Sequence, residues 1–139
     1  MPRPAYEPNP CYAATGGVVS QGWHEPVAGL PDRPMVLAVD GPAILAWDRV
    51  IEGLCRALHA RGVRTQRLDL RAWYAPWPEI VHATRSPGLA DDPDFDRLAG
   101  GDLTQLFHHL PAVGKPAAGV LVAFGPGAAL VGFDQLWYV

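Results

Sequence analysis

The chain has 139 residues, 49% of them hydrophobic, which points to one domain with a substantial apolar core. Its formal net charge of −3 and the lack of a basic stripe interleaved with aromatic residues argue against nucleic-acid binding. No apolar run approaches the ~20 residues of a transmembrane helix, and the amino terminus lacks the apolar core of a signal peptide, so no membrane partner is predicted and a cytoplasmic location is expected. The two cysteines, Cys11 and Cys55, have no zinc or redox spacing, and Cys55 is predicted to be a buried free thiol.

The first 34 residues are predicted to be a proline-rich lead-in, followed by one domain over residues 35–139. Seven prolines limit regular structure in the lead-in. The spacing of Trp23, Val27 and Leu30 nevertheless predicts one short helix between residues 22 and 30, with these three side chains facing inward.

The prediction of the fold depends on residues 35–61. Residues 35–39 form a continuous apolar run, which is typical of a strand covered on both faces. Four apolar residues then recur along one face of a predicted helix: Trp47, Ile51, Leu54 and Leu58. Gly62 is a natural residue for the end of that helix. The sequence therefore predicts a strand, a turn and a helix in succession.

The turn between this strand and helix has the length of a Walker A loop, G-x-x-x-x-G-K-[ST], but not its chemistry. With Gly41 as the first glycine, Trp47 takes the place of the lysine and Asp48 that of the hydroxyl residue. Pro42 also removes one amide donor. Because an indole carries no positive charge and a carboxylate repels phosphate, we predict a degenerate loop that does not bind ATP, with Trp47 in the core.

A second strand is predicted over residues 63–70, and Asp69 lies near its carboxyl end. Ligands of open α/β sheets bind at that edge, so Asp69 and Asp40, which follows the first strand, are candidate ligand residues. For Asp69, a solvated or capping carboxylate is the alternative interpretation.

Residues 71–118 form the least regular part of the sequence. Three aromatic residues lie close together around two prolines: Trp73, Tyr74 and Trp77. Such a cluster either lines a sugar pocket or covers the end of a core. Residues 79–84 predict one or two helical turns.

Four aspartates between residues 91 and 96 invite a metal-site interpretation. They fail the EF-hand pattern, because the twelfth position from Asp92 is Leu103 rather than glutamate. We expect instead that Asp92 or Asp94 caps a short helix that runs through Leu98.

Another helix is predicted from an Asp102 cap through Leu110, with its apolar residues inward. It contains the adjacent histidines His108 and His109. Adjacent helical residues point about 100° apart and make a poor pair of metal ligands, so one exposed and one half-buried histidine are expected. No metal site is predicted in the chain.

The last part of the chain predicts two more strands, over residues 119–124 and 135–139. Between them, Gly125-Pro126-Gly127 forms a sharp turn and residues 128–131 a helical turn. The sequence thus predicts an α/β fold with three layers and a mainly parallel sheet of about four strands. The candidate ligand residues are Asp40, Gly41, Trp47, Asp48, Asp69, Gly125 and Gly127.

The order of these elements resembles the first part of a uridine-kinase-like P-loop fold. The segments AVDGPAILAWD, DDPDFDRL and AFGPGAALVGFDQLWYV, with YEPNP before them, more specifically resemble a degenerate kinase-like domain that accompanies class I mannose-6-phosphate isomerase-like proteins in bacteria. The resemblance implies a P-loop NTPase-like topology with the strand order second, third, first, fourth, and the fourth strand at an exposed edge. Phe124 stands where such a fold carries an acidic residue.

The resemblance implies a non-catalytic accessory or interaction domain without a cofactor of its own. Its expected partner is a C-terminal isomerase domain, or another chain, bound through the last strand, and the chain is expected to be truncated at its C-terminal end. The zinc of such an isomerase belongs to its cupin barrel, and no zinc or isomerase residue is transferred to this chain. Two alternatives stay open. One is a nucleoside or sugar phosphotransferase that uses Asp40, Asp48 or Asp69 with magnesium. The other is a sugar or sugar-phosphate binding module that uses Trp73, Tyr74 and Trp77.

Overall fold

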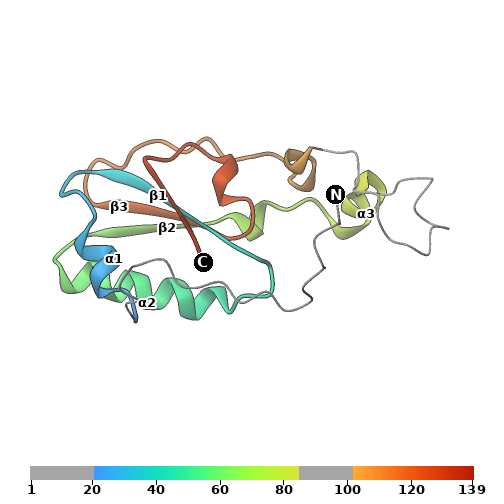
Figure 1. The fold of residues 1–139 in the computed structure, drawn as a ribbon. Helices are drawn as coiled ribbons and strands as arrows, with labels where there is room; N and C mark the ends of the chain where they lie inside the picture. Colours follow the sequence, from blue (N-terminus) through green and yellow to red (C-terminus); the bar gives the residue numbers. More distant parts are fainter. Residues whose placement is uncertain (1–20, 85–101) are drawn as a thin grey trace, which may run out of the picture.

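The computed structural model describes residues 21–84 and 102–139, which form an α/β domain around a four-stranded parallel sheet (Figure 1). Its α-helices are α1 (His24–Ala28), α2 (Trp47–Ala60) and α3 (Trp77–Thr84). Its strands are β1 (Met35–Asp40), β2 (Thr65–Asp69), β3 (Val120–Phe124) and β4 (Gln135–Tyr138). Its 3₁₀ helices are η1 (Leu70–Trp73), η2 (Leu103–Leu106) and η3 (Ala128–Leu130). Within the described residues no helix is long and apolar enough to cross a bilayer.

The sheet has the strand order β2-β3-β1-β4, which confirms the predicted order. All three strand pairs are parallel, with Val36 opposite Leu121 and Ala38 opposite both Ala123 and Leu136. The central strands β1 and β3 are almost completely buried, in keeping with their continuous apolar sequences. The strands β2 and β4 form the two edges.

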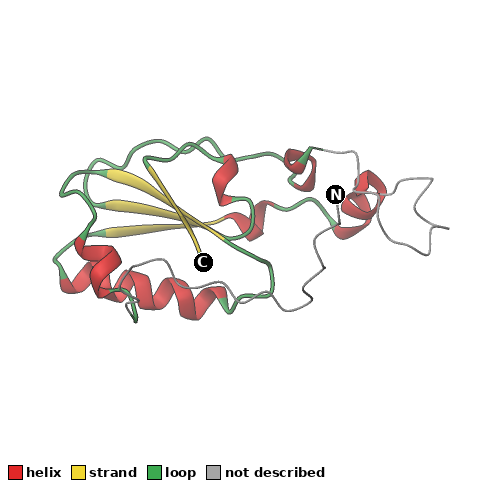
Figure 2. Cartoon of the chain, viewed as in Figure 1, coloured by secondary structure: helices red, strands yellow, loops and turns green. Residues whose placement is uncertain are grey.

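One face of the sheet is covered by α1 and α2, which lie side by side along it (Figure 2). The predicted apolar stripe of α2 packs into this core together with Cys55, which is a buried free thiol as expected. Val27 and Leu30 are buried against the same core, and Trp23 stacks on Trp137 of β4 at a centroid distance of 6.3 Å. These contacts confirm the inward face predicted for the short first helix.

The opposite face is covered differently from the predicted three-layer arrangement. Its apolar cluster contains Leu70, Phe107, Ala123 and Val131. In the described part of the chain, 3₁₀ helices and the extended residues 108–118 cover this face, whereas α3 lies beyond the carboxyl ends of β2 and β3 (Figure 1). The third layer therefore contains no α-helix among the described residues.

The helix predicted from Asp102 through Leu110 is wrong in its length. Asp102 does cap a helix, since its carboxylate accepts a hydrogen bond from the Thr104 amide at 2.8 Å, but η2 ends at Leu106. The backbone then pairs with residues 73–75 instead: the Ala75 amide donates to the Leu106 carbonyl and the His108 amide to the Trp73 carbonyl, each at 3.0 Å. This pairing places Phe107 in the core and leaves both histidines exposed, where one half-buried histidine was expected. The helix predicted over residues 92–98 lies outside the described residues.

Candidate functional site

The candidate ligand residues meet where β1, β2 and β3 end. Asp40 is the last residue of β1 and Asp69 the last of β2, while residues 125–127 follow β3 directly. Asp48 lies in the first turn of α2, which begins beside them. The parallel sheet thus brings these residues to one edge, as the sequence predicted.

The carboxylate of Asp40 is occupied by backbone amides. One oxygen, Oδ1, accepts hydrogen bonds from the amides of Gly41 at 2.7 Å and Gly127 at 3.1 Å. The other, Oδ2, accepts one from the Ala129 amide at 2.8 Å. Asp40 therefore connects the 125–130 turn to the end of β1. Because its carboxylate already accepts three hydrogen bonds, little acceptor capacity is left for a ligand.

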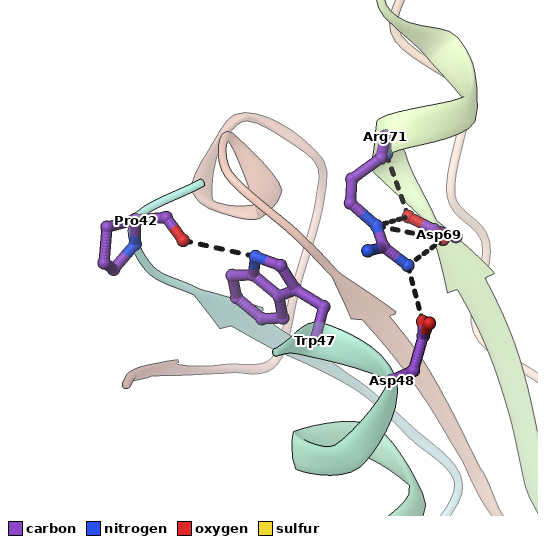
Figure 3. A network of polar contacts seen from close by, with 5 residues as sticks. All are labelled: Pro42, Trp47, Asp48, Asp69 and Arg71. Atoms are coloured by element: carbon purple, nitrogen blue, oxygen red, sulfur yellow. Dashed lines mark hydrogen bonds and ion pairs between the residues drawn. The ribbon is translucent and has the colours of Figure 1, made fainter. Parts of the chain in front are cut away.

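The turn after β1 is packed against the rest of the domain. A Cβ atom on Gly41 would lie 2.5 Å from the Val139 carbonyl oxygen, so this glycine is needed because the end of β4 approaches the backbone closely. Trp47 is 1% exposed, as predicted, and its Nε1 donates a hydrogen bond to the Pro42 carbonyl at 3.2 Å (Figure 3). The indole of Trp47 thus closes the turn on itself.

Arg71 joins the two remaining carboxylates. Its Nε lies 2.9 Å and 3.1 Å from the two oxygens of Asp69, and its Nη2 donates to Asp69 at 2.7 Å and to Asp48 at 2.9 Å (Figure 3). The Arg71 amide also donates to Asp69 at 3.0 Å, so Asp69 caps η1. The Asp48 side chain remains 91% exposed despite its ion pair.

The charges in this network stabilise one another. Partial burial raises the pKa of Asp69, but hydrogen bonds from the Arg71 side chain and amide outweigh burial and hold the pKa below its ordinary value. The hydrogen bonds that Arg71 donates to Asp69 and Asp48 raise the pKa of its guanidinium. Asp69 and Arg71 are therefore ionised at neutral pH, and the guanidinium is shared between two carboxylates.

The Gly125-Pro126-Gly127 segment is held as a structural turn. The Gly125 amide donates to the Val39 carbonyl at 3.1 Å, and the Tyr74 hydroxyl donates to the Pro126 carbonyl at 2.9 Å. At Gly127, φ is 89° and an added Cβ would lie 2.6 Å from the Phe107 ring. These contacts give both ends of the turn a packing role.

A family model described as a domain of unknown function (DUF8485) matches residues 22–139. The chain belongs to this family. Comparison with curated proteins and with solved structures found no match. The matched span runs from before α1 to the end of β4, so the whole sheet and the whole carboxyl-edge site lie within the DUF8485 domain.

The DUF8485 site is a closed polar network rather than an open ligand cradle. It contains three carboxylates and one guanidinium, and each carboxylate already accepts hydrogen bonds from the protein. Among the residues that the structure describes, no group of three or more potential metal ligands converges. An incoming phosphate would therefore meet an excess of negative charge at this edge.

The aromatic residues 73–77 of the DUF8485 domain do not share one environment. Trp73 contacts His109 edge to face at 4.7 Å and lines a shallow groove beside Arg67. Tyr74 packs on Phe107 at 4.8 Å, and Trp77 is 71% exposed on α3. The rings of Trp73 and Tyr74 thus cover the apolar cluster that contains Leu70 and Phe107, in agreement with the interpretation that these aromatic residues cover the end of a core.

Sequence reasoning missed Arg71 and the tethering role of Tyr74. A signal for Arg71 was present, because an aspartate commonly accepts a hydrogen bond from the amide two residues later, which brings residue 71 beside Asp69. The contact of Tyr74 with Pro126 spans 52 positions and has no local sequence signal.

Proposed function

We propose that this chain is a non-catalytic, P-loop-like domain that serves protein interaction beside a mannose-6-phosphate isomerase-like protein. The observation that carries the proposal is the turn between β1 and α2. It occupies the position of a phosphate loop on the central strand, yet a buried indole bonded to Pro42 replaces the lysine. The strand order β2-β3-β1-β4 supports the P-loop-like part of the proposal.

The surroundings of the turn support the absence of phosphoryl transfer. A phosphoryl-transfer site needs free cations and a metal bridge to neutralise the transferred phosphate. Here the guanidinium of Arg71 is bound to Asp69 and Asp48, and the carboxylate of Asp40 accepts three amides. A nucleotide would have to break these internal contacts before it found a partner.

The first test is a titration of the domain with ATP and magnesium, followed by tryptophan fluorescence and by calorimetry. We expect no saturable heat and no spectral change up to several millimolar nucleotide. The variant Trp47→Phe assigns any signal to the indole beside the turn. A saturable response would overturn the non-catalytic proposal and support the phosphotransferase alternative instead.

Edge strand β4 is the surface that we propose for association. Its sequence, QLWY, contains no charge and no proline, and Leu136 and Tyr138 are 42% and 77% exposed. Edge strands usually carry charges, prolines or bulges that prevent pairing with another chain. The opposite edge, β2, carries the exposed Arg67 and so has such protection.

The association is tested by sedimentation of the domain with a bacterial class I mannose-6-phosphate isomerase. We expect a complex that Leu136→Glu weakens at least tenfold, because the charge lies on the proposed interface. The matched control is Leu103→Glu, which changes another exposed leucine on η2, away from the β4 edge. No complex, or equal weakening by both variants, would contradict the proposed surface.

A further inference from the structure

A cavity of about 280 Å³ lies at the amino ends of the strands, opposite the carboxyl-edge site. The connection between α1 and β1, the end of α2 and the residues before β3 enclose it. Its volume lies below the roughly 300–1,000 Å³ of pockets for drug-sized ligands, so it suits a small molecule or a single charged group.

The cavity is lined by an excess of positive charge. Arg33, Arg61 and Arg64 all line it, and Asp32 is the one carboxylate among the described lining residues. This contrasts with the net charge of −3 of the whole chain and with the carboxylate-rich opposite edge. The two ends of the sheet therefore favour ligands of opposite charge.

The arginines are not needed to satisfy the end of α2. The Leu58 carbonyl accepts hydrogen bonds from the amides of Arg61 and Val63, both at 3.0 Å. The His59 carbonyl accepts one from the Gly62 amide at 2.8 Å. Backbone amides thus already satisfy these carbonyls at the helix terminus, without a contribution from the guanidinium groups.

One of the arginines is held in place and two are free to bind. Arg61 donates through Nη1 to the carbonyl of Val27, a residue outside the cavity lining, so part of its guanidinium already has a partner. Within residues 21–84 and 102–139, the side chains of Arg33 and Arg64 have no hydrogen-bond or ion-pair partner. Asp134, the acidic residue that Arg33 influences at longer range, is already paired with Lys115 at 2.6 Å.

We propose that this cavity binds a phosphate group, either free phosphate or the phosphate of a small monoester. Guanidinium groups bind phosphate oxygens through paired N–H donors, and several of them around a small cavity select a multiply charged oxyanion over a carboxylate. The site is independent of the proposed interaction function, since it lies at the other end of the sheet from the degenerate loop.

The test is a titration of the ¹⁵N-labelled domain at constant ionic strength, with the amides of Gly62 and Gly119 in the cavity wall as reporters. The ligands are inorganic phosphate, glycerol 3-phosphate, acetate and chloride. We expect saturable shifts with phosphate and with the ester at a dissociation constant on the order of 1 mM. Tighter binding of glycerol 3-phosphate than of phosphate would identify a monoester as the ligand, and the reverse would identify the free anion.

Variants that remove a positive charge or the negative charge from the cavity lining make the test specific. Arg33→Gln and Arg64→Gln should each weaken phosphate binding roughly tenfold, because each removes charged hydrogen bonds. Asp32→Asn should tighten it, an outcome that damage to the fold cannot produce. Arg49→Gln removes the same charge from an exposed position on α2 outside the cavity and should leave binding unchanged. The proposal is overturned by shifts that do not saturate, by acetate binding as well as phosphate, or by an Arg49→Gln effect as large as that of Arg64→Gln.

Discussion

Replacing Asp40 distinguishes a structural carboxylate from a catalytic one. Two of its hydrogen bonds are tertiary, to the amides of Gly127 and Ala129. A hydrogen bond to a charged group contributes about 1.5–3 kcal/mol, and we take the lower value because Ala129 is exposed. Asp40→Ala removes both bonds and should cost about 3 kcal/mol, whereas Asp40→Asn keeps one acceptor oxygen and should cost about 1.5 kcal/mol.

The assay is urea unfolding followed by tryptophan fluorescence, with amide hydrogen exchange at Gly127 and Ala129. Exchange at both amides should accelerate in Asp40→Ala, which removes both acceptor oxygens, and at one of them in Asp40→Asn, which keeps one acceptor oxygen. Asp48→Asn is the control: its carboxylate is 91% exposed and makes one ion pair, so its loss should cost less than about 1 kcal/mol. A carboxylate that serves metal binding or catalysis typically reduces the stability of the fold. An Asp40→Asn variant that is as stable as the original protein, or more stable, would therefore refute the structural role and reopen the phosphotransferase alternative.

Three further predictions concern the fold around the two ends of the sheet. Gly62 and Gly119 both have φ of 75°, but only at Gly119 would an added Cβ meet a backbone atom, at 2.1 Å. In chemical unfolding, Gly62→Ala should lower the free energy of unfolding by about 1–2 kcal/mol, and Gly119→Ala should lower it by at least about 2 kcal/mol more. Equal losses for the two variants would contradict the clash at Gly119. Trp47→Ala should lower the free energy of unfolding by about 3–5 kcal/mol, since the indole is buried, and a loss below about 1 kcal/mol would show that it does not hold the turn. Because the pKa of Asp69 is lowered in the folded state, its stabilising effect is present above its ordinary pKa of 3.8 and is lost as the pH falls through the lower folded pKa. Because the side chains of Arg71 and Asp69 are both about a third exposed, Arg71→Gln should lower the free energy of unfolding by at most about 1 kcal/mol near pH 7. This loss should shrink below about pH 4. A loss that stays constant in acid would contradict the ion pair between Arg71 and Asp69.

The regular elements were predictable because their signals are local. A continuous apolar run gives a buried strand and a 3.6-residue stripe gives a covered helix, and β1, α2 and β3 satisfy these rules almost residue by residue. Where tertiary contacts compete with local preference, prediction was less successful. Residues 106–108 have a helical apolar pattern, but their backbone groups pair with residues 73–75, so the helix ends early.

The position of the site was also predictable, because parallel strands end at a common edge. Its chemistry was not, since the sequence places Asp40 and Asp69 at that edge without showing what they contact. The decisive partners are amides 87 and 89 positions away from Asp40, and an arginine that the local pattern did not mark. Acidic residues at a ligand edge thus indicate either a ligand site or an internal clamp, and only the tertiary contacts distinguish the two.

Under the proposed function, the contacts at this edge also account for a domain that folds without a nucleotide. A phosphate loop directs backbone amides at an anion, and amides without a partner reduce stability when the anion is absent. Here a carboxylate of the chain itself accepts the amides of the 125–130 turn, and the indole of Trp47 donates to the loop carbonyl. Because Asp40 is covalently attached, it occupies these donors at all ligand concentrations. Trp47→Lys alone would leave the Asp40 contacts and the Asp48–Arg71–Asp69 network in place, so under the proposed function we expect it not to confer phosphate binding.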